Sequence, residues 1–391
     1  MLYHIVKPII RLALLVFCRK IYINRRDYYS CKGPMILAVN HPNSFFDAVV
    51  TGVFFKQPVH FLARGDAFRK NWAYKILTSL KCIPVYRLRE GKEYLHLNED
   101  SFERCRQVLR KKGIVLIFSE GLCINEWNIR PLRKGTARLA FSAWSDPEIG
   151  RQMKVLPVGL NYNSFNRFGK KVYVRFGEFI SFTDADTGLT DGANHNRFNQ
   201  LLAEQLDTLC FNGVPNNHRC NQVFSFLVNN ICGSRQYERL NTLSGRFTTR
   251  EPEWQPLEEV ASRYHCAPNK QQANTSLAIA LFTALPALAG WLVSGWFYRV
   301  ARHLIKKKNR ELGHYDSIMF TALALFYPFY VLLLASIAGI ITGKWAVFAL
   351  VFAGVPVTAF FLTVFWPNWL KFWNYHHLNN EQRISLQRLT D

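Results

Sequence analysis

The chain has 391 residues, a net charge of +22, 49% hydrophobic residues and 15% aromatic residues, so it is long enough for one large domain or two. High charge together with high hydrophobicity indicates a basic soluble domain joined to membrane segments, whose basic face would meet anionic lipid or a phosphorylated substrate. The apolar residues lie in long uncharged runs, and no basic patch is interleaved with aromatic residues, which argues against a nucleic-acid partner.

The nine cysteines are scattered along the chain without a Cys-x-x-Cys pair. We therefore expect reduced, buried thiols on the cytosolic side of a membrane, and neither a disulfide framework nor a zinc site. His376-His377 has no acidic or cysteine pattern beside it, so the sequence implies no metal and no organic cofactor.

Residues 1–32 are predicted to form an amphipathic helix that lies in the membrane interface. No acidic residue precedes Asp27, and the uncharged run 12–18 is too short to span a bilayer. A secretory signal is the alternative, but no clear small-residue cleavage site follows. One helical stripe collects the apolar residues Ile5, Ile9, Leu12 and Val16.

Residues 33–185 alternate short apolar runs with helical stretches, a pattern typical of an α/β fold with a mainly parallel sheet flanked by helices. The strands are expected at 35–39, 58–62, 83–87, 114–118, 155–160 and 172–176. The helices are expected at 44–55, 71–80, 100–112 and 134–145.

The segment Asn40-His41-Pro42 ends the first of these strands. Pro42 cannot continue a central strand and disfavours helix at the residue before it, so His41 lies in a turn before a helix that begins near Ser44. If Asp47 lies in the first turn of that helix, its carboxylate can reach His41. A histidine oriented by a carboxylate is a general base for a hydroxyl group or water. The structural alternative is a capping box, in which Ser44 and Asp47 only close the helix start.

Further polar groups are expected at strand ends. Arg87 follows a strand and could bind a phosphate, or be an ordinary solvated arginine. Glu120-Gly121 follows a buried strand and forms a tight turn at the same edge of the sheet as His41. Proline and glycine within 155–160 imply an edge strand, a bulge or a close backbone approach. A basic group around the start of the helix at 134–145 suits either phosphate or plain solvent exposure: Arg130, Arg133, Lys134 and Arg138.

Four segments then stand in one order along residues 33–180. They are Asn-His-Pro-Asn-Ser-Phe-Phe-Asp at 40–47, Ile-Pro-Val-Tyr-Arg at 83–87, Phe-Ser-Glu-Gly at 118–121 and Leu-Pro-Val-Gly-Leu at 156–160. This order resembles the four blocks of the glycerolipid acyltransferase superfamily, which includes glycerol-3-phosphate and lysophosphatidate acyltransferases.

The resemblance implies a role for each block. His41 would be the general base on the acceptor hydroxyl, and Asp47 would orient it. The remaining blocks would bind substrate: Arg87 would contact the acceptor phosphate, Glu120 and Gly121 would shape the acceptor site, and Pro157 would lie on the acyl-donor side.

Two departures from the superfamily pattern bear on the acceptor. Five residues separate His41 from Asp47 where most members have four, a spacing that resembles eukaryotic-type acyltransferases acting on glycerol-3-phosphate or dihydroxyacetone phosphate. The third block usually reads Phe-Pro-Glu-Gly-Thr-Arg, whereas here Ser119 replaces the proline and Leu122-Cys123 replaces Thr-Arg. The usual arginine is therefore missing, and its place could be taken by Arg130, Arg133 or Lys134.

The function implied is transfer of a fatty acyl group from acyl-CoA or acyl carrier protein to a hydroxyl of glycerol-3-phosphate or lysophosphatidate in phospholipid synthesis. No nucleophilic serine or cysteine motif is evident, so we expect direct transfer without an acyl-enzyme. The alternatives are an O-acyltransferase for another lipid, such as a lysophospholipid or a lyso amino-acid lipid, and a non-catalytic lipid-binding membrane protein. The sequence leaves the acceptor, the acyl chain length, the donor and the oligomeric state open.

Residues 186–275 are polar and are expected to form a helical connector or lid, with short helices at 196–210, 222–231 and 235–243. Residues 276–391 are expected to form a hydrophobic membrane region. Its three uncharged stretches are each long enough to span a bilayer: 276–298, 317–343 and 345–370.

The positive-inside rule puts the basic loop 299–316 in the cytosol, and the last two stretches then form a hairpin with Lys344 outside. A full span at 276–298 would place the acyltransferase domain outside, away from cytosolic acyl thioesters. Pro286 and Gly290 therefore favour a re-entrant or interfacial hairpin there. We expect a membrane protein, in the inner membrane if bacterial, whose acyltransferase domain faces the cytoplasm.

Overall fold

The computed structural model describes residues 2–86, 97–211, 218–230, 254–262, 265–308 and 314–390, and the chain divides into two compact units. Unit 1 comprises Met1–Leu14, Ile21–Tyr162 and Val172–Phe211. Unit 2 comprises Leu15–Lys20, Asn163–Lys171 and Asn212–Asp391. The loop between two strands of unit 1 therefore belongs to unit 2.

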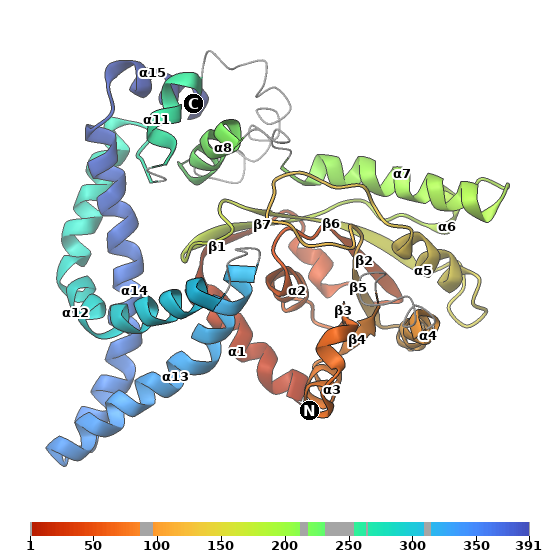
Figure 1. Ribbon diagram of the computed structural model, residues 1–391, viewed down its shortest axis with the longest axis horizontal. Coiled ribbons are helices and arrows are strands. Elements are labelled where there is room, and N and C mark those ends of the chain that lie inside the picture. The colour runs from red at the N-terminus through yellow and green to blue at the C-terminus, as the bar shows by residue number, and fades with distance from the viewer. Residues whose placement is uncertain are drawn as a thin grey trace. The chain divides into compact units, whose positions relative to one another are not determined.

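Unit 1 is built on a seven-stranded sheet in the order β1-β7-β6-β2-β5-β3-β4 (Figure 1). Strand β2 pairs in parallel with β5 and β6, β3 pairs in parallel with β4 and β5, and β6 pairs antiparallel with β7. The predicted α/β class with a mainly parallel sheet is confirmed. The strands are β1 Cys18–Ile23, β2 Met35–Val39, β3 Val59–Arg64, β4 Cys82–Val85, β5 Ile114–Phe118, β6 Lys154–Tyr162 and β7 Lys170–Phe176.

Helices cover both faces of this sheet. Alternate residues of β2 and β5 point to one face, where they form a single buried cluster with side chains of α4, α5 and α7. The α-helices of unit 1 are α1 Leu2–Phe17, α2 Phe45–Gly52, α3 Asn71–Ser79, α4 Leu97–Arg110, α5 Gly135–Trp144, α6 Phe182–Ala185 and α7 Asp191–Leu209, with 3₁₀ turns at Arg26–Ser30 and Gly65–Phe68.

The N-terminal segment is helical only as far as Phe17, so the prediction of a helix over this whole segment is wrong after that residue. The next residues form the edge strand β1 instead. The reason is that Ile21, Tyr22 and Ile23 are strong strand formers. Tyr22 stacks on Tyr173 of the neighbouring strand β7, with ring centroids 4.7 Å apart, and such cross-strand aromatic pairs stabilise a sheet.

Helix α1 turns Lys7 and Arg11 toward the protein and one apolar stripe outward. Arg11 Nε donates to the Val53 carbonyl at 2.9 Å, and Lys7 Nζ donates to the Phe55 carbonyl. These carbonyls follow the end of α2, where cations are favoured. The apolar stripe points away from the protein and is exposed at Ile5, Ile9 and Leu12.

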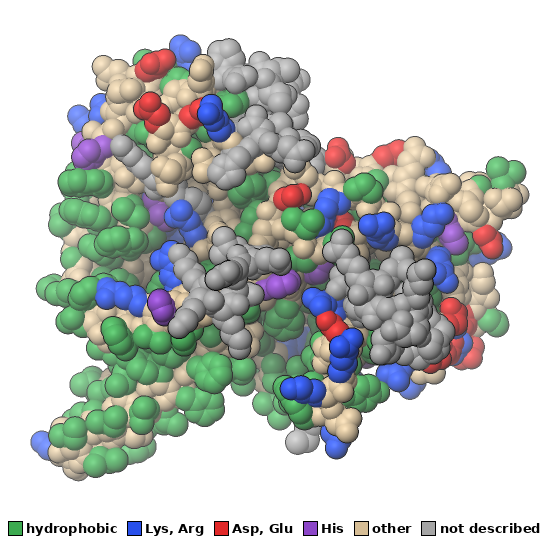
Figure 2. Space-filling model, in the orientation of Figure 1, with side chains coloured by type: hydrophobic (Ala, Val, Ile, Leu, Met, Phe, Trp, Pro, Cys, Tyr) green, Lys and Arg blue, Asp and Glu red, His purple; other side chains and the backbone are tan. Residues whose placement is uncertain are grey.

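Unit 2 contains three helices that are long and apolar enough to cross a membrane, α12 Lys270–Lys308, α13 Tyr315–Thr342 and α14 Trp345–His376. Hydrophobic side chains cover their surface (Figure 2), as in Phe282, Phe329 and Leu350. The remaining elements are α8 His218–Asn230, a 3₁₀ turn Gln255–Leu257, α11 Glu258–Ala261 and α15 Asn380–Thr390. The helix expected at 235–243 lies outside the described residues.

The first membrane stretch is one helix, so two helices joined by a turn are not formed within 276–298, while the re-entrant course expected for this stretch stays a prediction. Helix α12 is continuous for 39 residues, with Pro286 inside it. It bends instead (Figure 1), because a proline removes one backbone hydrogen bond and a glycine at position 290 permits a close helix crossing.

Candidate active site

The candidate site lies at the carboxyl edge of the parallel strands. Strand β2 ends at Val39, whose register partners are Phe118 at the end of β5 and Val158 in β6. The Ser119 amide donates to the Val39 carbonyl at 3.0 Å and so continues this pairing. His41 and Glu120, which follow these two strands, therefore lie at the same edge, where α/β folds bind ligands.

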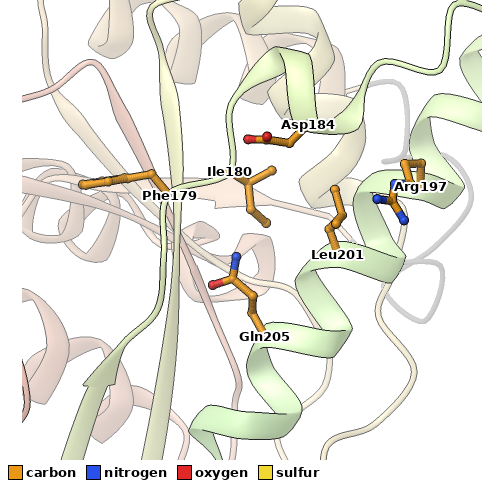
Figure 3. A pocket seen from close by; sticks show the side chains of 6 residues that line it. All are labelled: Phe179, Ile180, Asp184, Arg197, Leu201 and Gln205. Atoms are coloured by element: carbon orange, nitrogen blue, oxygen red, sulfur yellow. The ribbon is translucent and has the colours of Figure 1, made fainter.

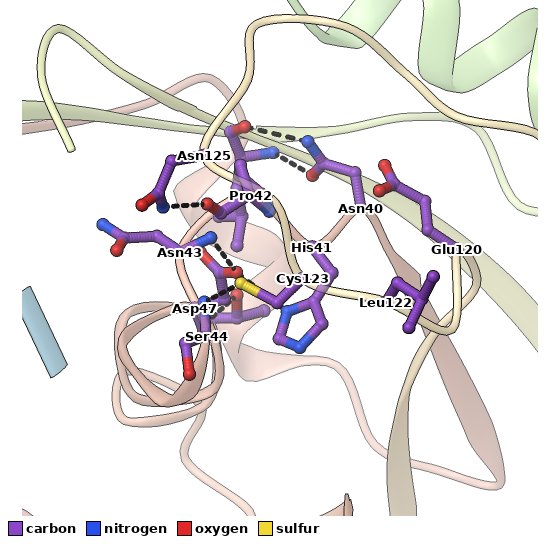
Figure 4. A network of polar contacts seen from close by, with 12 residues as sticks. Asn40, His41, Pro42, Asn43, Ser44, Asp47, Glu120, Leu122, Cys123 and Asn125 are labelled. Carbon is purple, nitrogen blue, oxygen red and sulfur yellow. Dashed lines mark hydrogen bonds and ion pairs between the residues drawn. The ribbon is translucent and has the colours of Figure 1, made fainter. Parts of the chain in front are cut away.

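The turn that carries His41 is braced by amide side chains. Asn40 donates through Nδ2 to the Leu160 carbonyl at 3.0 Å and accepts the Leu160 amide at 2.7 Å, so its side chain extends the sheet by one step. Asn125 Nδ2 donates to the Pro42 carbonyl at 2.6 Å. Figure 4 shows both contacts beside the His41 ring.

His41 and Asp47 are in direct contact. The His41 Nδ1 atom lies 2.9 Å from Asp47 Oδ2, which also accepts the Asn43 amide at 2.7 Å. The second carboxylate oxygen, Oδ1, accepts the Tyr162 hydroxyl at 2.6 Å. Asp47 is fully buried, and the His41 ring stacks on Phe118 with centroids 3.7 Å apart. The sheet and three donors therefore fix the orientation of the pair.

This geometry decides between the two interpretations of Asp47. In a capping box the Asp47 carboxylate would accept the Ser44 amide, and the Ser44 hydroxyl would cap the helix. The Ser44 side chain makes no capping hydrogen bond, and its amide donates to Cys123 Sγ at 2.9 Å. Asp47 is directed to His41 instead, so the capping-box alternative is excluded.

The contact also sets the protonation of the imidazole. Because Nδ1 faces a carboxylate, Nδ1 carries the proton and donates it, and Nε2 keeps its lone pair. The His41 side chain is 17% exposed, so one part of the ring reaches the surface while Asp47 does not. A neutral imidazole with a free Nε2 can accept a proton from a hydroxyl group.

Glu120 is buried against Arg130. Arg130 Nε donates to Glu120 Oε2 at 2.9 Å, and Nη2 donates to the same oxygen and to the Leu122 carbonyl. Nη2 also lies 3.5 Å from the His41 carbonyl. Burial raises the pKa of Glu120, and Arg130 opposes this shift. Gly121, at a φ of 71°, forms the turn between them in a conformation that favours glycine.

Cys123 occupies the position of the missing third-block arginine. Burial raises the pKa of its thiol to about 12. The thiol is therefore protonated at neutral pH, and a protonated thiol is a poor nucleophile.

The other predicted site residues that the structure describes do not belong to the hydrogen-bond network around His41. Arg133 and Lys134 are exposed at the start of α5, and neither makes an ion pair within the described part of the chain. Pro157 is buried inside the sheet opposite Ala38, three residues before His41, so the structure does not bring it to the strand edge. Arg87 lies outside the described residues.

Sequence reasoning missed Tyr162 and Asn40, although both belong to the polar network. Asn40 precedes His41 and Tyr162 ends β6, so each was visible only as a polar residue beside a strand. The close approach expected in β6 is confirmed at Gly159, where a Cβ atom would lie 2.6 Å from Leu209 Cβ.

A pocket of about 270 Å³ lies elsewhere in unit 1, between the segment after β7 and helix α7 (Figure 3). None of its lining residues belongs to the His41 network. Among the described residues, no group of three or more His, Cys, Asp or Glu side chains could hold a metal ion. The pocket is lined by Phe179, Ile180, Asp184, Arg197, Leu201 and Gln205.

Comparison with known proteins identifies the class. Residues 20–161 match the family model described as Acyltransferase, and the match contains the whole His41 network apart from Tyr162. The chain thus carries an acyltransferase domain and the protein is an acyltransferase, which confirms the resemblance seen in the four blocks.

The crystal structure of PlsC from Thermotoga maritima, a 1-acyl-sn-glycerophosphate (LPA) acyltransferase, matches with 13% sequence identity and a TM-score of 0.37, over 52% of this chain and 78% of that one. No curated protein matches this chain.

Proposed function

We propose that this protein is a membrane-bound acyltransferase that moves a fatty acyl group from an acyl thioester to a hydroxyl of glycerol-3-phosphate or lysophosphatidate in phospholipid synthesis. The observation that carries the proposal is the His41–Asp47 contact at the strand edge of an acyltransferase domain. A buried carboxylate holds Nδ1 and leaves Nε2 for the acceptor.

The reaction proceeds by direct transfer. The acceptor oxygen attacks the thioester carbonyl while its proton moves to His41 Nε2, and Asp47 stabilises the imidazolium that forms. The tetrahedral intermediate then collapses, the carbon–sulfur bond breaks, and the departing thiolate takes the proton from Nε2. The products are an ester and a thiol. General-base help of this kind is worth about 10² to 10⁴ in rate.

The state of Cys123 supports direct transfer over an acyl-enzyme. Cys123 is the cysteine of the third block, and its sulfur accepts the backbone amide of Ser44 at 2.9 Å. With a pKa raised to about 12 by burial, this thiol supplies almost no thiolate at neutral pH.

Arg133 and Lys134 are the cations we assign to the acceptor phosphate. They precede the first turn of α5, where free backbone amides and the helix dipole also favour an anion. Arg130 is the less suitable candidate, because its Nε and Nη2 are engaged by Glu120 and Leu122. Its ion pair with Glu120 holds the turn that follows β5.

The apolar helices of unit 2 support a membrane location for the enzyme. Acyl-CoA and acyl carrier protein are cytosolic donors, so the proposal places the acyltransferase domain on the cytoplasmic face. The exposed apolar stripe of α1 would lie in the membrane interface.

A second candidate acceptor is a lipid without a phosphate monoester, such as a lyso amino-acid lipid. The observation that favours it is the third block, where Leu122 and Cys123 are uncharged and Arg130 is already paired.

The test supplies purified, detergent-solubilised protein with labelled acyl-CoA or acyl carrier protein and one of three acceptors: glycerol-3-phosphate, lysophosphatidate or a lyso amino-acid lipid. We expect one phosphate acceptor to be acylated and His41→Ala to be inactive. Turnover of the amino-acid lipid alone would establish the second candidate. Equal inertness of wild type and His41→Ala with all acceptors and both donors would refute the catalytic proposal.

Phosphate binding is tested separately with Arg133→Ala and Lys134→Ala. Each should raise KM for a phosphate acceptor, by about tenfold for one charge-assisted contact. The matched control is Arg138→Ala, an exposed cation of the same helix whose guanidinium lies over the Phe102 ring. If all three variants have the same KM, neither residue binds the phosphate.

A further inference from the structure

The buried carboxylate of Asp47 depends on neutral donors. Among the described residues its ion-pair partner is His41, and no lysine or arginine contacts it. A buried carboxylate is costly unless hydrogen bonds replace the water it loses. The Asn43 amide and the Tyr162 hydroxyl provide them, one on each oxygen.

We propose that Tyr162 is a positioning residue for the His41–Asp47 pair, an inference that rests on the proposed function. Its hydroxyl holds Oδ1 at 2.6 Å while Oδ2 faces His41 at 2.9 Å, so the two contacts fix the carboxylate from opposite ends. Tyr162 is fully buried, so it acts through Asp47 and does not touch substrate.

Tyr162 is itself held rigidly. It is the last residue of β6, its carbonyl accepts Trp127 Nε1–H at 2.7 Å, and its ring lies 5.9 Å from Phe46. Two residues earlier, Leu160 is bonded twice to the Asn40 side chain. The same strand thus braces the histidine turn and carries the hydroxyl that orients the aspartate.

The test compares Tyr162→Phe with Tyr29→Phe. Removing the Tyr162 hydroxyl should lower kcat by roughly 10- to 100-fold, the effect of one hydrogen bond to a charged group, and leave KM unchanged. The acid limb of the pH–rate profile should move to higher pH, because the carboxylate then interacts more strongly with imidazolium. Tyr29 is a matched control, since its buried hydroxyl has no partner among the described residues.

A turnover-independent measurement separates this proposal from the proposed function. In protein labelled with ¹⁵N-histidine, the Nδ1 signal of His41, assigned with His41→Ala, should change in Tyr162→Phe and stay constant in Tyr29→Phe. An unchanged signal, or an unchanged kcat and pH profile, would overturn the role of Tyr162. A changed signal in a protein that acylates no acceptor would support the positioning role and refute the proposed function alone.

An independent observation concerns helix α12 and uses contacts within unit 2 only. The loop 163–171 is connected to the start of α12. Asn163 Nδ2 donates to Asn229 Oδ1 at 2.8 Å, and Asn229 Nδ2 bonds His265 Nδ1 at 2.9 Å. Asn374, at the end of α14, donates to the His265 carbonyl. The approach to α12 and the end of α14 therefore lie beside this loop.

The start of α13 contacts the same loop. Lys170 and Asp316 are both fully buried and form an ion pair, and Lys170 also donates to the Ser164 carbonyl at 3.0 Å. Phe17 packs edge-on against Phe320 with centroids 5.5 Å apart. The first turn of α13 is thus on the same side of any bilayer as the loop.

The geometry points to a helix α12 that enters the membrane and returns, so that only α13 and α14 cross it. Six residues separate Lys308 from Tyr315, a connection that reaches about 25 Å at most. A hydrocarbon core is about 30 Å thick, so the end of α12 cannot lie across it from the start of α13. Both ends of α12 are then on the side of loop 163–171.

The middle of α12 contacts the middle of its neighbours, as a returning helix requires. A Cβ atom on Gly290 would lie 2.2 Å from the Thr358 carbonyl oxygen of α14. Ser294 Oγ lies 2.9 Å from the Tyr327 hydroxyl of α13. The Tyr330 hydroxyl of α13 donates to the Val293 carbonyl of α12 at 2.7 Å.

The charges agree with this arrangement. Lysines lie at both ends of α12 and near the end of α14, whereas Lys344 alone marks the α13–α14 turn among the residues described there. The basic side, which also carries residues 163–171, is the cytoplasmic side by the positive-inside rule.

The topology is tested in the full chain with a protease site inserted before Lys270, between α12 and α13, or at Gly343. In vesicles of one orientation, the first two sites should be cut from the same face and the third from the opposite face. Detergent should expose all three sites, which controls for protection by folding. Cleavage of the first two sites from opposite faces would overturn the proposal.

Discussion

The strand-edge site of unit 1 and the long helices of unit 2 use polar groups in opposite ways. At the site, hydrogen bonds converge on one carboxylate and leave one part of the His41 side chain exposed. In unit 2 polar contacts between elements are sparse along the apolar helices, and the Lys170–Asp316 pair is completely enclosed. The first arrangement holds one carboxylate in a fixed orientation beside His41, and the second ties the start of α13 to residues 163–171.

This difference predicts how each region fails. Loss of a polar group at the site should remove activity and leave the fold, because the sheet is held by its own apolar core. Loss of a polar group in unit 2 should lower the stability of the fold. The molecules that remain folded should keep their kcat. The following variants test that separation.

The largest effect is expected from Asp47→Asn. The amide cannot stabilise imidazolium and allows the wrong tautomer, so kcat should fall on the order of 10³-fold. Acyl transfer is measured under saturating substrates, with thermal unfolding alongside. The control is Asp146→Asn, a buried carboxylate paired with Arg110, which should lose stability but keep kcat. Retention of a tenth of the activity in Asp47→Asn would show that the pair is not the base.

The next effect is expected from Lys170→Met, which leaves Asp316 buried without its cation. Breaking one partner of a buried pair costs about 3–5 kcal/mol, whereas replacing both partners by apolar residues is often neutral. The double variant Lys170→Met/Asp316→Leu should therefore recover most of the lost unfolding temperature.

A matched exposed pair checks this result. Arg25 and Glu178 form an ion pair at the surface of unit 1, and Arg25→Ala should leave the unfolding temperature nearly unchanged, because solvent screens an exposed pair. Equal unfolding temperatures for Lys170→Met and the double variant would mean that leaving Asp316 without Lys170 does not destabilise the protein.

The site was predictable from the sequence to the extent that it is local. Pro42 and the apolar helix after it placed His41 in a turn, and Asp47 is close enough along the chain to reach it. Tyr162 could not be predicted, because it meets Asp47 only through the parallel pairing of β2 with β6. The role of Glu120 was open for the same reason, since its partner Arg130 follows a long loop.

For the helices at the two ends of the chain, the sequence predicted length better than shape. Their lengths follow from uncharged runs, and the spans at 317–343 and 345–370 agree with α13 and α14. Strand β1 was missed because Arg19 and Lys20 continue the basic pattern of the helix before it. Within 276–298, proline and glycine are compatible with either a bent helix or a turn between two helices, and the structure has a single bent helix in which Gly290 packs against Thr358.

A smaller effect is expected from Gly290→Ala, which probes that packing. The added Cβ would overlap the Thr358 backbone, so α12 and α14 must move apart at a cost of about 1–3 kcal/mol. Gly354→Ala on α14 is the control, because nothing lies within 4 Å of its Cβ position and alanine favours a helix. Equal unfolding temperatures for the two variants would rule out a close contact at Gly290.

The smallest effect concerns pH and the His265 contact at the start of α12. Burial lowers the pKa of His265 to about 3. A histidine that stays neutral in the folded state contributes stability above its ordinary pKa of 6.5, and this contribution is lost as pH falls from 6.5 toward 3. At pH 5 the loss is about 2 kcal/mol. Charges that also disfavour its protonation come from Lys371, Arg19, Arg167 and Lys171.

His265→Gln should therefore flatten the dependence of unfolding temperature on pH between 7 and 5. Burial also lowers the pKa of His60 in β3 to about 4, so His60→Gln is the matched variant in unit 1. Glu120 acts with the opposite sign, because burial raises its pKa and its contribution is lost as pH rises above 4.5. Hydrogen exchange at pH 5 should thus show the segment before α12 opening in wild type, with no further opening on acidification in His265→Gln. The same acid response in both proteins would mean that His265 is not the group that couples pH to unit 2.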